Sequence, residues 1–90
     1  MEVAFSNSFK KAFKKKVKTD PNLAKEFWIS LELFISDPFN VSLRTHKLSG
    51  KLKHLWSFSI NYNNRVVFYF TGDTPQKAVL TDIGSHEEVY

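Results

Sequence analysis

Residues 56–70, WSFSINYNNRVVFYF, decide the fold class of this chain. Large apolar residues alternate with small polar ones over residues 56–62, which predicts a strand with one face in the core and one small, polar face open. Residues 65–70 are an arginine followed by an unbroken apolar run, which predicts a central strand. Asn63-Asn64 between them predicts a tight hairpin turn, because asparagine adopts positive φ cheaply. The side chains of the first strand expected in the core are Trp56, Phe58, Ile60 and Tyr62.

Two helices are predicted before this hairpin. Residues 6–8, Ser-Asn-Ser, offer N-caps, and Phe9, Phe13 and Val17 recur every four residues among lysines, which predicts an amphipathic helix that ends near Thr19. Asp20-Pro21 predicts the start of a second helix, as an N-cap followed by proline at the first helical position, and this helix runs to about residue 36.

Two further strands complete the predicted fold. Residues 2–5 read as a short first strand, and residues 77–83 read as a last strand closed by Gly84. The order strand, helix, helix and three strands predicts an α+β fold, in which an N-terminal strand and a helical hairpin pack on a mostly antiparallel, twisted sheet. Ninety residues suffice for one core, so residues 1–90 are expected to form a single domain.

The composition excludes several classes of protein. Hydrophobic residues make up 42% of the chain and aromatic residues 16%, which argues against disorder. The absence of cysteine excludes disulfides, thiolate metal sites and thiol nucleophiles. The three histidines are not in a zinc spacing, so neither a metal nor a cofactor is expected. No apolar run reaches the roughly 18 residues of a membrane span and no signal-peptide pattern opens the chain, so we expect a cytoplasmic protein without a membrane partner.

Positive charge is concentrated in two segments. The formal net charge is +4, but residues 38–72 contain no acidic residue and six lysines lie between Lys10 and Lys18. The basic residues of the acid-free segment are Arg44, Lys47, Lys51, Lys53 and Arg65, joined by His46 and His54. Such surfaces attract polyanions in a salt-dependent way. The alternative for the lysine-rich segment is a solvated, solubilising surface.

Four residues have the chemistry for cutting RNA without a metal. Cleavage needs a base for the 2′-hydroxyl proton, an acid for the leaving 5′-oxygen and a cation for the phosphate. His46 and His86 can serve as acid and base, Arg65 can hold the phosphate, and Tyr90 can stack on a base. We expect the two imidazoles and the guanidinium to surround a common hollow.

Each of these residues also has a structural interpretation. His46 can cap a loop, Arg65 can pair with Asp82 or Glu87, and Tyr90 can simply pack against the sheet. Spacing alone does not decide between the two interpretations.

The chain resembles the RelE/ParE superfamily of bacterial type II toxins, and is most similar to its YafQ-like branch. Four segments in order carry this resemblance over nearly the full length: His46–Gly50, Leu55–Ile60, Arg65–Tyr69 and Asp82–Tyr90. The resemblance implies a RelE-like fold and a metal-independent endoribonuclease that enters the ribosomal A site and cleaves the mRNA there. It also implies a cognate antitoxin that blocks the toxin, with operator DNA bound only through the antitoxin complex.

By position, the resemblance implies catalytic roles for four residues. His46 matches the histidine that ends the loop before the first long strand, Arg65 matches the phosphate-holding arginine, His86 matches the C-terminal histidine, and Tyr90 matches an aromatic that orients the substrate. The residues expected to contact RNA are Lys47, Lys51, Lys53, His54, Ser57, Ser59, Lys10, Lys11 and Lys14.

Two departures from the family pattern concern the open strand face. Ser59 stands where YafQ-like toxins carry a further histidine and RelE a lysine, and Asn64 stands near an aspartate position of the YafQ-like branch. Two rival hypotheses are a ParE-like toxin that poisons DNA gyrase and a decayed, non-toxic binding module. The histidine in the tail and Arg65 argue against the gyrase hypothesis, because a toxin that only binds needs no acid–base pair.

Overall fold

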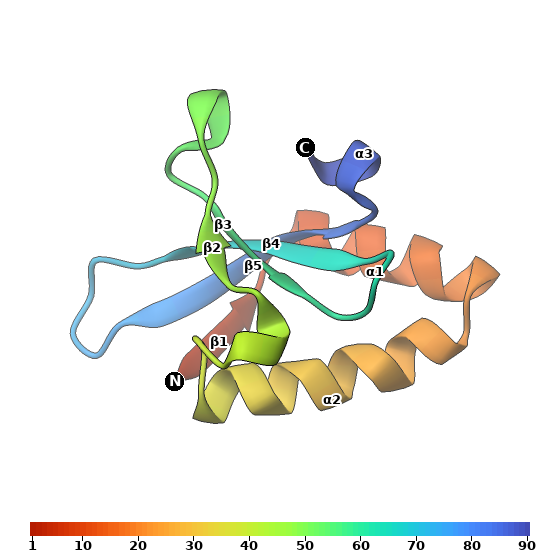
Figure 1. Cartoon of the computed structure of the whole chain (residues 1–90), viewed down its shortest axis with the longest axis horizontal. Helices are drawn as coiled ribbons and strands as arrows, with labels where there is room; N and C mark the ends of the chain where they lie inside the picture. Colours follow the sequence, from red (N-terminus) through yellow and green to blue (C-terminus); the bar gives the residue numbers. More distant parts are fainter.

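A five-stranded sheet covered on one face by a helical hairpin forms the body of the protein (Figure 1). The computed structural model describes residues 1–90. The strands are β1 (Glu2–Phe5), β2 (His46–Lys47), β3 (Trp56–Ser59), β4 (Arg65–Phe70) and β5 (Lys77–Gly84). The helices are α1 (Asn7–Thr19), α2 (Asn22–Ser36) and α3 (His86–Val89), with two 3-10 turns, η1 (Val41–Leu43) and η2 (Gly50–Leu52). The predicted α+β class is confirmed, and the predicted elements follow one another in the predicted order, with β2 and α3 in addition.

The sheet has the order β1-β5-β4-β3-β2, with only β1 and β5 parallel. The other neighbours are antiparallel, which confirms the mostly antiparallel sheet. Strand β4 occupies the centre, where Val66, Val67 and Phe68 of its apolar run are buried while Tyr69 is exposed. The long connection through α1 and α2 carries the chain from β1 to the far edge of the sheet.

The two helices begin by different means. Ser6 caps α1 as predicted, since its Oγ accepts the N–H of Phe9 at 3.1 Å. The predicted cap of α2 is wrong by one residue, because Pro21 occupies the cap position and no side chain caps the helix. The carbonyl of Asp20, rather than its carboxylate, accepts the N–H of Leu23 at 3.0 Å.

An aromatic core lies between the helices and the sheet. Phe34 of α2 stacks on Phe58 of β3 with ring centroids 4.5 Å apart, and Phe68 of β4 meets Phe34 edge-on at 4.9 Å. Trp56 and Ile60 pack against the same cluster, as predicted. Burial of these large rings is the main source of stability for a domain of this size.

The hairpin between β3 and β4 differs from the prediction. Strand β3 ends at Ser59, and residues 60–64 form a loop rather than a two-residue turn. Asn61 explains the difference, because its Oδ1 accepts the N–H groups of Asn63 at 2.9 Å and Asn64 at 2.8 Å. Neither Asn63 nor Asn64 has positive φ. Tyr62 is consequently 91% exposed rather than in the core.

Two short elements that the pattern did not predict rise on the side of the sheet away from α2 (Figure 1). One is the excursion from β2 through η2, which the sequence presented only as a loop; β2 pairs with β3 through His46–Ser57 and Lys47–Trp56. The other is α3, which ends the chain. None of the helices combines the length and apolarity needed to cross a membrane.

Candidate active site

The C-terminal segment is held against the body by Glu88. Ser85 and Glu88 form a reciprocal capping box, in which Glu88 Oε1 accepts the Ser85 N–H at 2.8 Å and Ser85 Oγ accepts the Glu88 N–H at 3.3 Å. Lys16 of α1 also donates to Glu88 Oε1, at 2.6 Å. The Lys16 ammonium and then the Ser85 N–H lower the pKa of Glu88 from 4.5 to about 2.

Gly84 allows α3 to pack closely. A Cβ at this position would lie 3.0 Å from Glu88 Oε1 and 3.2 Å from Val89 Cγ1. A larger residue would therefore force the side chains of Glu88 and Val89, or α3 itself, to shift. Four residues of helix could not hold a position alone, so these contacts determine where His86 and Tyr90 lie.

Tyr90 contacts three other residues of the site. Its hydroxyl donates to Ser57 Oγ on β3, and its ring lies 5.5 Å from the guanidinium carbon of Arg65. The His86 ring meets the Tyr90 ring edge-on, with centroids 4.5 Å apart. His86, Tyr90 and Arg65, which are up to 25 residues apart in sequence, are thus brought together.

Arg65 opens β4 and has no acidic partner. It pairs with Ser59 on β3 and with Gly84 on β5 in the sheet register. Its Nε is buried without a hydrogen-bond partner, which is uncommon for a buried donor. The expected structural alternative of pairing with Asp82 or Glu87 is absent, because the only ion pairs are Lys16–Glu88 and Lys77–Glu2.

His46 is exposed, and a neighbouring carbonyl group determines which of its two ring nitrogens carries the proton in the neutral form. Its Nδ1 lies 2.8 Å from the backbone oxygen of Arg44. A carbonyl oxygen only accepts, so Nδ1 carries the proton in the neutral ring and Nε2 keeps a free lone pair. His46 faces the same side of the sheet as Ser57, its partner in β3.

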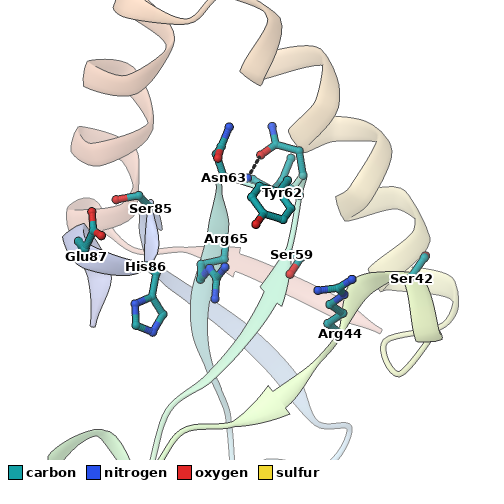
Figure 2. Close-up of a pocket in the computed structure, with 11 residues that line it drawn as sticks. Ser42, Arg44, Ser59, Tyr62, Asn63, Arg65, Ser85, His86 and Glu87 are labelled. Carbon is teal, nitrogen blue, oxygen red and sulfur yellow. Dashed lines mark hydrogen bonds between the residues drawn. The ribbon is translucent and has the colours of Figure 1, made fainter.

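Two hollows meet at His86. The larger has a volume of about 750 Å³, and Figure 2 shows that Arg65 and Ser59 lie between His86 and Arg44 along it. The smaller, of about 360 Å³, lies between the η2 excursion and α3 and is bordered by His46, His86 and Tyr90. The expected single hollow is therefore divided: His86 borders both hollows, Arg65 the larger, and His46 the smaller. The residues of the larger hollow are Ser42, Arg44, Ser59, Ile60, Asn61, Tyr62, Asn63, Arg65, Ser85, His86 and Glu87.

The residues expected to contact RNA fall into different places. Ser57 is only 1% exposed beneath Tyr90, so the expectation that it lies open to a ligand is wrong. Ser59 borders the larger hollow and Lys47 the smaller. His54 borders a separate hollow of about 440 Å³ on the sheet. The remaining expected contacts are exposed lysines outside all three hollows: Lys10, Lys11 and Lys14 on α1, and Lys51 and Lys53 around η2.

Asn64 is the other departure from the family pattern. It is buried, and its side chain makes a hydrogen bond within the loop of residues 60–64. Its side-chain amide lies 3.3 Å from Asn61 Oδ1, and it does not border the larger hollow.

Arg44 is the site residue that sequence reasoning did not select. It counted only as part of the acid-free segment, yet it borders the larger hollow. The position of Arg44 depends on its own left-handed backbone conformation, which no pattern in the sequence predicted. No cluster of three His, Cys, Asp or Glu side chains in the chain could hold a metal ion.

Solved toxins share this fold. YafQ from Escherichia coli, which has also been solved in complex with DinJ, superposes with a TM-score of 0.76 at 17% identity over 99% of this chain and 97% of that one. A YoeB/ParE toxin from Agrobacterium tumefaciens gives 0.75 at 18% identity, covering 96% and 99%. A copper-bound mutant toxin from Helicobacter pylori gives 0.74 at 25% identity, covering 100% and 99%.

The family to which the chain belongs follows from its whole length. No curated protein sequence matches it significantly. The family described as "Bacterial toxin of type II toxin-antitoxin system, YafQ" matches residues 1–90. The chain therefore belongs to the YafQ family of type II toxins.

Proposed function

We propose that this toxin is a ribosome-dependent endoribonuclease that cleaves mRNA in the ribosomal A site by acid–base catalysis without a metal. The convergence of His86, Tyr90 and Arg65, where the start of β4 lies beside the end of β5, is the observation that carries this proposal. A toxin that acted by binding alone would need neither an exposed imidazole nor an unpaired guanidinium at the same place.

The scissile phosphate lies, in this proposal, where the two hollows meet at His86. The Arg65 guanidinium donates to its oxygens and stabilises the charge that builds up in the transition state. The Tyr90 ring, held over Arg65 and hydrogen-bonded to Ser57, limits the orientations of both Arg65 and His86.

The two histidines take different roles. His46 is the base, because the Arg44 carbonyl holds its proton on Nδ1 and leaves Nε2 free to accept the 2′-hydroxyl proton. The 2′-oxygen then attacks phosphorus, and the bond to the 5′-oxygen breaks. Protonated His86 is the acid that gives its proton to that leaving oxygen. The products are a 2′,3′-cyclic phosphate and a free 5′-hydroxyl, so protons and bonds balance.

A cognate antitoxin is the partner that keeps this activity in check, as the complex of E. coli YafQ with DinJ supports. Operator DNA is bound only through that complex. The exposed lysines of α1 and of residues 47–53 contact ribosomal RNA.

Cleavage on programmed ribosomes tests this proposal. The purified wild type should produce new 5′ ends by primer extension only when ribosomes are present, with and without 1,10-phenanthroline, which chelates transition metals and leaves the Mg²⁺ of the ribosome in place. His86→Ala should lower the cleavage rate by roughly 100- to 10,000-fold, because it removes the proton donor. Glu32→Ala, an exposed change on α2, is the control and should cleave like the wild type.

Three results would contradict the proposal. They are equal cleavage by wild type and His86→Ala, cleavage of free RNA at the ribosome-dependent rate, and loss of activity in 1,10-phenanthroline. An intact message together with inhibited supercoiling by gyrase would support the ParE-like alternative instead.

A further inference from the structure

Arg44 has an unusual backbone. It is the only residue other than glycine with positive φ, at φ 51° and ψ 38°, where it ends η1. Glycine and asparagine adopt this left-handed conformation more easily than arginine, whose Cβ is strained there. Residues with strained backbone conformations are concentrated at functional sites. The strained backbone of Arg44 therefore indicates that its guanidinium has a function.

The sheet register aligns Arg44 with the active-site residues. Arg44 lies just before β2, whose His46 pairs with Ser57, and Ser59 on the same strand β3 pairs with Arg65. Figure 2 shows Arg44 with its guanidinium directed toward Ser59.

Neither arginine in this row is neutralised. No ion pair involves Arg44 or Arg65, although both border the larger hollow. The hydroxyls of Ser42 and Ser59 border the hollow beside them, and the one carboxylate of the hollow, Glu87, lies at the His86 end in Figure 2. Two unpaired guanidiniums in one hollow, with the Ser59 hydroxyl between them, suit a ligand with repeated negative charges.

We propose that Arg44 binds a backbone phosphate adjacent to the scissile one, so that Arg44 and Arg65 together hold two phosphates of one RNA strand. This inference rests on the proposed function, because it takes the ligand of the hollow to be RNA. Arg44 then performs two tasks: its side chain positions the strand, and its carbonyl holds the proton of His46 on Nδ1.

Salt-dependent binding of a short single-stranded 2′-O-methyl RNA measures the side-chain task without cleavage. Each phosphate contact contributes about 0.7 to the slope of log K against log salt for single strands. Arg44→Asn keeps a residue suited to left-handed backbone and loses the charge. It should therefore lower the slope by about 0.7 and weaken binding roughly tenfold at low salt. Arg44→Lys should retain most of the slope.

Lys25→Asn on α2 is the matched control, because it removes the same charge from an exposed residue that does not border the hollow. It should leave the slope unchanged, and circular dichroism should show that all variants remain folded. Equal slopes for the wild type and Arg44→Asn, equal losses in Lys25→Asn, or no binding by the wild type would overturn the inference. Failure of the nuclease proposal would appear separately, as absence of cleavage by a wild type that still binds through Arg44.

Discussion

The two faces of the sheet differ in the interactions that attach the helices to them. The face toward α1 and α2 is filled by large rings, with Phe34, Phe58 and Phe68 fully buried. The opposite face is held by polar contacts: the Ser57–Tyr90 hydrogen bond and the Lys16–Glu88 ion pair attach α3 to the body. Apolar burial stabilises the first face. The second face buries less apolar surface and instead presents cations and imidazoles to the solvent.

The largest expected effect is on the helix-covered face. Phe58→Ala should lower the free energy of unfolding by about 3–5 kcal/mol, because it opens a cavity against Phe34. Ser59→Ala, one residue away on the other face, should change it by less than about 0.5 kcal/mol. Urea unfolding followed by circular dichroism measures both. Similar losses of unfolding free energy in the two variants would contradict the proposed difference between the two faces.

Gly84→Ala should have the next largest effect. The added Cβ would meet Glu88 and Val89 at 3.0–3.2 Å, so either α3 shifts or the end of β5 is strained. We expect a loss of about 1–3 kcal/mol in unfolding free energy, as for other overpacked sites, and a larger proportional loss of cleavage rate. A variant with wild-type cleavage would show that the position of α3 is not critical.

Tyr90→Phe should lower stability by about 1–2 kcal/mol, because it leaves the buried hydroxyl of Ser57 without a partner. The ring over Arg65 remains, so cleavage should stay within about tenfold of the wild type. Adding Ser57→Ala removes the orphaned hydroxyl and should restore part of the stability. Additive losses in the double variant would contradict this explanation.

The smallest expected effect concerns Glu88, whose side chain is 51% exposed in its pair with Lys16. Glu88→Gln should cost at most about 1 kcal/mol at neutral pH, since exposed pairs are screened by water. Because the folded pKa is lowered, the wild type's advantage is complete above pH 4.5 and disappears as the pH falls toward about 2. Unfolding midpoints of both variants across this range measure it. An advantage that grew in acid would have the wrong sign.

Local patterns predicted the regular elements well. The period of four in Phe9, Phe13 and Val17, and the alternation through Trp56 and Phe58, depend on side-chain directions that neighbours in sequence determine. One error, the cap of α2, arose where the backbone carbonyl of Asp20 took the place of its carboxylate. Another arose where a side chain replaced a backbone contact. Asn61 closed a loop in place of the expected turn and left Tyr62 outside the core.

The candidate site was predictable in its residue types but not in its arrangement. His46, Arg65, His86 and Tyr90 were selected by chemistry and by resemblance, and the sheet register then brings their segments to one side. Ser57 was wrongly expected to lie open, because only the folded tail covers it. Arg44 was missed, because its left-handed backbone is imposed by how η1 joins β2.

The sequence by itself determined the α+β class, the helical hairpin, the apolar face of the sheet and the supply of positive charge, since each follows from residues close together in the chain. Only the tertiary structure decided that α3 lies over Ser57, that His86 separates two hollows, and that Arg44 aligns with Arg65. The physical reason is that these contacts join segments as far apart as Lys16 and Glu88, whose meeting depends on the packing of the whole domain.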